Sequence, residues 1–221
     1  QAMSALLLLG PEAQQTGAAK ALTNVRRIGV FPIDSASVPG YLVLALEAAP
    51  GENQLEFLKK CEAGLRSGLE QAGVTGTLEH GFWIDIPEVS FEQWTSAAGK
   101  FKFKLNHQGR EVGVSFFQTD KQIAKPQPTE HKEMLTIALS EISTDEPVTF
   151  KTYLHLKENN KFYLYLRDGR QLQREQKQRL SASGLANVFM KDADVDNFRI
   201  FLAAAYLKET IRTSNGGQQA A

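Results

Sequence analysis

The feature that most constrains this chain is a pair of alternating segments in its last third. Residues 149–156 and 161–166 alternate aromatic or aliphatic side chains with other residues, and the polar run Lys-Glu-Asn-Asn at 157–160 separates them. Two such runs joined by a short polar turn are typical of an antiparallel β-hairpin. Because an isolated hairpin is only marginally stable in water, the pattern predicts a compact unit built with the neighbouring segments.

The segments around this hairpin predict a mixed helix and strand unit. An apolar run at 134–142 is expected to form a strand before the hairpin. After it, a turn at 167–169 leads to a helix over 172–183, which Gly184 is predicted to end. Residues 188–190 then predict a short apolar strand.

A final amphipathic helix is predicted from Asp192, as its N-cap, to about Ile211. Its apolar side chains recur at helical spacing, and they are Val195, Phe198, Phe201, Leu202, Ala205 and Tyr206. We expect this stripe to pack across the hairpin, against Tyr153, Tyr163 and Tyr165.

The start of the chain predicts a β-α-β segment. Residues 6–9 and 28–33 are apolar runs typical of buried strands, and residues 12–22 between them predict a helix. A receiver domain opens in this way, but it needs an acidic pair after the first strand to hold Mg²⁺. Here Gly10 and Pro11 stand in that place, so the segment is at most a receiver-like start that has lost phosphorylation.

The rest of the first half predicts further strands and one long helix. A third apolar run at 41–46 precedes a helix over 52–72 whose leucines fall mostly on one face. An aromatic strand at 82–86, a short helix at 90–97 and a second alternating hairpin at 101–116 follow.

The length of 221 residues and a proline-containing polar stretch favour two units. We expect an N-terminal unit over 3–117, a linker over 118–131 and a C-terminal hairpin-helix-strand-helix module over 132–212. The predicted fold class is α+β, as two small units that each combine a β-hairpin with flanking helices.

Charge and cysteine content limit the classes of function. With 25 basic and 25 acidic residues the chain is neutral, whereas nucleic-acid-binding domains are typically basic. A single cysteine, Cys61, allows no internal disulfide, which favours the reducing cytoplasm. The apolar run at 6–9 is too short to span a membrane. We therefore expect a cytoplasmic protein that binds no nucleic acid and does not insert into membranes.

Residues that carry out catalysis or bind metals are sparse. The four histidines, His80, His107, His131 and His155, lack the close spacing of metal ligands or catalytic pairs. We expect His107 and His131 to be solvated, and His155 to be exposed or a partly buried polar residue of the hairpin. Cys61 is interpreted as a packing residue. The sequence thus predicts no catalytic residue, no metal and no cofactor.

An enzyme remains an alternative. It would require His155, Cys61 or the carboxylates of Asp85 and Glu88 to meet in a cleft and have shifted pKa values.

The densest basic run offers a candidate ligand site. Arg167, Arg170, Arg174 and Arg179 can donate forked hydrogen bonds to phosphate or carboxylate groups. Arg170 and Arg174 form an Arg-x-x-x-Arg unit that, with residues 181–184, resembles the paired motifs by which PilZ domains bind cyclic di-GMP. However, the second motif follows too closely and lacks its Asp or Asn. A solvated helix face is the competing interpretation.

A spaced pattern of residues runs through the C-terminal third. Its positions are Phe150, Tyr153, Leu154, Leu156, residues 161–166, Asp168, Gly169, Arg179, Leu180, Gly184, residues 188–191, Asp194 and Phe198. This pattern resembles accessory domains that precede HD-GYP phosphodiesterase domains in delta-type and predatory bacteria. The resemblance implies a non-catalytic module for signalling or scaffolding around second-messenger enzymes. The sequence contains neither the His-Asp pair nor the Gly-Tyr-Pro motif of the phosphodiesterase itself.

These observations predict a non-enzymatic, cytoplasmic regulatory or protein-interaction module in bacterial signalling. Its expected partner is another protein, which an exposed hairpin edge is suited to bind, and a homodimer is a further option. The alternative function is binding of a phosphorylated small ligand such as cyclic di-GMP by the four arginines.

Overall fold

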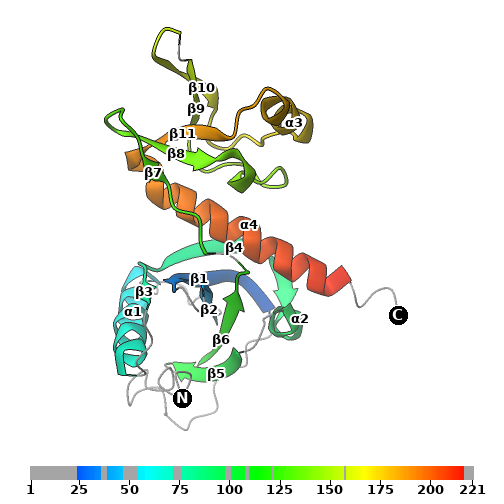
Figure 1. Ribbon diagram of the computed structural model, residues 1–221. Helices are drawn as coiled ribbons and strands as arrows, with labels where there is room; N and C mark the ends of the chain where they lie inside the picture. The colour runs from blue at the N-terminus through cyan, green and yellow to red at the C-terminus, as the bar shows by residue number, and fades with distance from the viewer. Residues whose placement is uncertain are drawn as a thin grey trace. The chain divides into compact units, whose positions relative to one another are not determined.

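A computed structural model describes residues 24–35, 39–46, 54–71, 76–97, 101–107, 110–120, 122–156 and 158–216. Within them the chain has an α+β fold with two antiparallel sheets (Figure 1). It divides into two compact units, of which the second comprises Ala124–Tyr206. The first unit comprises the residues up to Ile123 and those from Leu207 onward. The predicted β-α part of the opening, with Gly10 and Pro11, lies outside the described residues.

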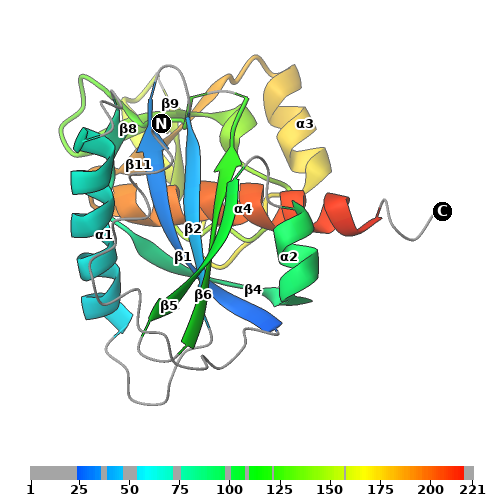
Figure 2. The ribbon, with the colours of Figure 1, turned by 90° about the horizontal axis from the view of Figure 1, so that it is seen from below.

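The first unit contains a six-stranded sheet (Figure 2). Its strands are β1 (Asn24–Asp34), β2 (Gly40–Leu46), β3 (Thr77–Leu78), β4 (Phe82–Ser90), β5 (Phe101–His107) and β6 (Arg110–Gln118). They run in the order β3-β1-β2-β6-β5, and β4 also pairs with β1. Every pairing among them is antiparallel, whereas a receiver domain has a parallel sheet.

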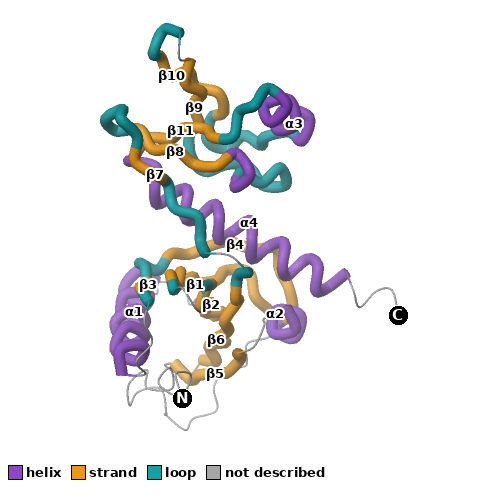
Figure 3. The backbone as a smooth tube through the Cα atoms, in the orientation of Figure 1, coloured by secondary structure: helices purple, strands orange, loops and turns teal. Residues whose placement is uncertain are grey.

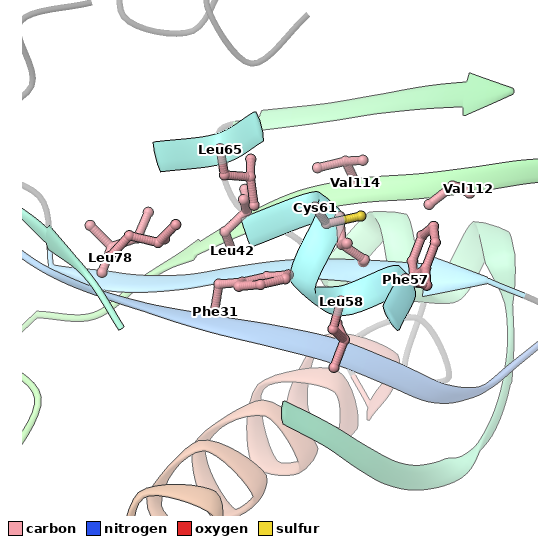
Figure 4. Packing of buried hydrophobic residues seen from close by; sticks show 11 residues of the cluster. Phe31, Leu42, Phe57, Leu58, Cys61, Leu65, Leu78, Val112 and Val114 are labelled. Atoms are coloured by element: carbon pink, nitrogen blue, oxygen red, sulfur yellow. The ribbon is translucent and has the colours of Figure 1, made fainter. Parts of the chain in front are cut away.

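Helix α1 (Gln54–Gln71) covers one face of this sheet. Its apolar residues at helical spacing, among them Leu58 and Leu65, pack with Phe31 and Leu42 of the sheet (Figure 4). This arrangement confirms the predicted apolar face of the helix. A Cβ atom at Gly29 would lie 2.8 Å from Leu58 Cδ2, so glycine lets the helix approach β1 closely.

Helix α2 (Phe91–Ala97) packs on the other face of the first sheet. Successive residues of a strand point to opposite faces, and Val112 and Val114 of β6 join the α1 core. Phe117 points the other way, and its ring centroid lies 6.3 Å from that of the buried Trp94. The sheet is therefore buried on both faces where these helices lie.

The second unit contains a five-stranded sheet (Figure 3). Its strands are β7 (Gln127–Pro128), β8 (Met134–Ala138), β9 (Thr152–Leu156), β10 (Lys161–Leu166) and β11 (Asn187–Lys191), in the order β10-β9-β11-β8-β7. Strands β9 and β10 confirm the predicted hairpin. Strand β7 lies inside the stretch predicted as a linker, at 118–131, and pairs with β8.

The helical segments of this unit are η3 (Leu139–Glu141), α3 (Arg174–Ala182), η4 (Asp192–Asp194) and α4 (Val195–Gly216). Helix α4 passes from the second unit to the first at Leu207. Gly184 follows α3 with a φ of 81°, as the predicted helix end requires. Asp192 opens η4 and does not cap the long helix, so that part of the prediction is wrong.

The core of the second unit gathers around Phe150. Its ring meets those of Phe198 and Phe201 edge to face, at centroid distances of 5.4 and 5.6 Å. This contact confirms that α4 turns its apolar stripe to the core. The predicted tyrosine face is only partly correct, because Tyr165 packs against this core whereas Tyr163 is 46% exposed.

Candidate functional site

The four arginines singled out in the sequence lie in two neighbouring elements of the second unit. Arg167 and Arg170 belong to the turn after β10, where the Arg170 N–H donates to the Arg167 carbonyl oxygen at 3.2 Å. Arg174 and Arg179 lie in α3, and a spacing of five residues separates them by about 140° around the helix axis. The four arginines are therefore divided between the turn and α3, and the two in α3 point in different directions around the helix axis.

These arginines are nevertheless available to a partner. All four are exposed, and none has a side-chain hydrogen bond or ion pair within the part of the chain that the structure describes. The surrounding stretch, 151–179, holds eight basic and three acidic residues in a chain that is neutral as a whole. The hairpin and α3 thus form the basic region of the second unit.

Next to these arginines lies strand β10, which forms one edge of the second sheet (Figure 1). It pairs with β9 from Lys161 to Leu164, and the register shifts before Leu166. No backbone hydrogen bond links the other edge of β10 to any described segment. An edge strand presents N–H and C=O groups that can pair with another chain.

Large exposed hydrophobic side chains gather on this hairpin. They are Leu156, Tyr163 and Leu164, with exposed fractions of 42%, 46% and 43%. Among the described residues, no other large hydrophobic residue is exposed. Single exposed apolar residues are common on protein surfaces, but a group of them often marks a binding surface. Unpaired backbone groups and exposed apolar side chains therefore coincide on the hairpin β9–β10, with Tyr163 and Leu164 on the edge strand itself.

The two faces of the hairpin have different roles. Leu154 of β9 faces the core that includes Phe150. His155 lies opposite Phe162 of β10 in the register and therefore faces the other way. Its ring stacks on that of Phe162 with a centroid distance of 4.6 Å and an interplanar angle of 23°.

His131 completes an aromatic cluster on this outer face. Its ring packs edge to face on His155 and Phe162, at centroid distances of 4.7 and 4.9 Å. Thr129 holds the preceding loop, because its hydroxyl accepts from the His131 N–H and donates to the Met134 carbonyl oxygen. The prediction that His131 is solvated is wrong, since its side chain is only 21% exposed. No local sequence signal indicated this contact.

A shallow hollow lies beside the cluster. Its lining comprises Pro128, Thr129, Glu130, His131, His155, Asn160 and Phe189. Asn160 Oδ1 lies 2.9 Å from His155 Nε2, so it fixes the orientation of that imidazole. Glu130 Oε1 lies 3.6 Å from His131 Nε2. His155 is thus a partly buried polar residue, one of the two options that its sequence position left open.

The groups named for an enzyme are engaged in other contacts. Cys61 packs in the core under α1, and burial raises the pKa of its thiol to about 12. Asp85 pairs with Arg27 and Glu88 with Arg26, at 3.3 and 2.6 Å. The thiol is therefore protonated at neutral pH, unlike a catalytic thiolate.

A second polar network joins α1 to the connection between β3 and β4. Glu62 accepts hydrogen bonds from Arg66 Nη2 at 3.0 Å and from the Gly81 N–H at 3.4 Å, and His80 Nδ1 lies 3.0 Å from it. Burial by itself raises the pKa of Glu62, but the hydrogen bonds with Arg66, His80 and Gly81 bring it below its ordinary value. We assign this network a structural role.

The described residues contain no group of three or more His, Cys, Asp and Glu side chains arranged to hold a metal ion. Among the same residues, no helix has both the length and the apolar character needed to cross a membrane. His107 lies at the end of β5, where the structure describes the backbone but not the side chains.

Comparisons with known proteins identify no family. No protein-family model and no curated protein matches the chain. Among solved structures, it is similar to the crystal structure of the chemotaxis protein CheX from Vibrio vulnificus. The TM-score is 0.32 at 11% identity, and the match covers 52% of this chain and 93% of that chain. A likeness of this size assigns neither a family nor a function.

Proposed function

We propose that the chain is a non-enzymatic regulatory protein that binds a protein partner through the hairpin β9–β10. One observation carries the proposal: the exposed large hydrophobic residues of the described chain all lie on this hairpin, at Leu156, Tyr163 and Leu164. Exposed apolar groups of this kind mark interaction surfaces in soluble proteins.

The non-enzymatic character of the proposal is supported by the state of the groups that could carry out chemistry. Cys61 is a buried thiol with a pKa of about 12, and Asp85 and Glu88 are each paired with an arginine. A role in bacterial signalling, in the cytoplasm, accords with the resemblance of the last third to modules around second-messenger enzymes.

Photo-crosslinking in the native cell tests the proposal. A benzophenone amino acid placed at position 164 should form a discrete protein adduct, whereas the same group at position 92 should not. Glu92 is a suitable control because it is exposed and lies on α2 of the first unit. The partner identified from the adduct should then bind the purified chain.

The decisive measurement is the affinity of that purified partner for a hairpin variant. Leu164→Asp should weaken binding by about tenfold or more, equivalent to about 1.4 kcal/mol, while Glu92→Ala should leave it unchanged. Equal crosslinking from positions 164 and 92, or equal affinity of both variants, would exclude the hairpin as the binding surface.

A further inference from the structure

We infer that β10 binds an acidic, extended peptide segment of the partner, which adds to the second sheet as a sixth strand. This inference rests on the proposed function and specifies the chemistry of the partner at the same site. Strand β10 combines an unpaired edge, alternating side chains and basic residues at both of its ends.

The backbone of β10 determines the mode of binding. Because β9 is the only described strand beside it, alternate N–H and C=O groups along its outer edge are free to pair with an incoming strand. The register shift before Leu166 interrupts regular pairing. The regular stretch, Lys161 to Leu164, is therefore about 13 Å long and accommodates a short segment.

The side chains of β10 determine which residues fit beside it. Phe162 and Leu164 point to the outer face and Tyr163 to the inner one, as the register with β9 requires. Phe162 is held in place by His155 and His131, so it offers a fixed apolar contact. On such a surface, β-branched and aromatic residues make favourable cross-strand pairs. The segment should therefore carry residues such as valine or threonine at its centre.

The basic residues at the ends of β10 determine which charge the added peptide segment should carry. Lys161 begins the strand and Arg167 directly follows it, and both are exposed. Neither has a side-chain ion pair within the described residues. Glutamate or aspartate at both ends of the added segment would pair with them.

The same charges disfavour a second copy of the chain as the occupant. In an antiparallel pair of β10 strands, the Lys161 end of each copy would face the Arg167 end of the other. A parallel pair would bring equivalent cations together. Like charges placed opposite one another destabilise a strand pair, so charge complementarity selects an acidic partner.

Synthetic peptides test the inference on the full-length protein. The probe is fluorescein-labelled Glu-Val-Thr-Val-Thr-Val-Glu, and its binding is followed by fluorescence anisotropy. We expect a micromolar Kd, about tenfold or more tighter than that of the same peptide with lysine at both ends. Methylating alternate backbone nitrogens of the acidic peptide should weaken binding by about tenfold, because strand pairing needs those N–H groups.

A charge-reversed variant provides the matched test on the protein side. Lys161→Glu together with Arg167→Glu should reverse the preference, so that the lysine peptide binds more tightly than the acidic one. Arg179→Glu, which reverses an exposed charge on α3, should retain the original preference. Circular dichroism should confirm that all variants remain folded.

The outcomes separate this inference from the proposed function. If the crosslinked partner binds through Leu164 but both peptides bind equally, or N-methylation has no effect, the hairpin is an interaction surface without strand addition. If sedimentation reveals a dimer that Leu164→Lys dissociates, the second copy is the occupant. Either result overturns the inference of an acidic strand.

Discussion

The ring of Phe201 in α4 lies edge-on to the ring of Phe150, with their centroids 5.6 Å apart and their planes at 76°. Both residues are 1% exposed. Phe150 lies two residues before the start of β9 and also contacts Phe198. The contact therefore anchors the first part of α4 in the core of the second unit.

Replacing Phe201 by alanine should destabilise this unit strongly. Truncation of a buried phenylalanine typically costs about 3 to 5 kcal/mol, because apolar contacts are lost and a cavity remains. Urea unfolding followed by near-ultraviolet circular dichroism of the tyrosines would measure the change, since four of the five tyrosines lie in the second unit. Tyr163→Ala is the control: the residue is 46% exposed, so the loss should stay below about 1 kcal/mol. Equal losses would contradict the assigned core.

The first unit should depend on pH through Glu62. Its folded-state pKa lies below the ordinary value, so it contributes stability above its unfolded-state pKa of about 4.3. That contribution is lost as the pH falls through the lower, folded-state pKa. Glu62→Gln should therefore reduce the free energy of unfolding near neutral pH, by about 1 to 2 kcal/mol, and the difference should shrink toward zero in acid.

Tryptophan fluorescence during urea unfolding can follow this change, because Trp83 and Trp94 both lie in the first unit. Glu70→Gln is the matched control: it removes an exposed carboxylate from the same helix. If Glu62→Gln and Glu70→Gln show the same pH profile, the Glu62 network does not stabilise α1.

Local patterns in the sequence were sufficient to predict elements whose partners are close in the chain. Alternation located the hairpin β9–β10, and helical spacing located the buried face of α1 around Leu58 and Leu65. In both cases the residues that contact one another, or share a face, follow a simple period. The α+β class followed from the same periodicities.

Contacts between distant segments could not be predicted in this way. The prolines at 126 and 128 suggested a linker, yet Gln127 and Pro128 pair with β8 at a sheet edge, where proline is tolerated. His131 packs on His155 and Phe162, and no spacing in the sequence encodes that approach. Likewise, the run of arginines in the sequence did not show that it is divided between a turn and α3.

The thiol of Cys61 should be unreactive in the folded protein. Burial raises its pKa to about 12, so the thiolate that attacks alkylating reagents is scarce at neutral or mildly basic pH. Iodoacetamide should modify Cys61 slowly under native conditions and rapidly in concentrated urea. Ala63→Cys in a Cys61→Ala background is the control, because position 63 is exposed on the same helix. Rapid native modification of Cys61 would reveal an accessible, activated thiol and revive the enzyme alternative.

The arginine alternative predicts binding of cyclic di-GMP, and we expect calorimetric titration of the full chain to give no saturable heat. Arg174 and Arg179 diverge by about 140° around α3, and the hollow lined by His131 and His155 includes none of the four arginines. We therefore expect that no single dinucleotide receives forked hydrogen bonds from both Arg174 and Arg179. Micromolar binding that disappears in Arg170→Ala with Arg174→Ala, but persists in Arg179→Ala, would instead establish a ligand site where the Arg167–Arg170 turn meets the start of α3.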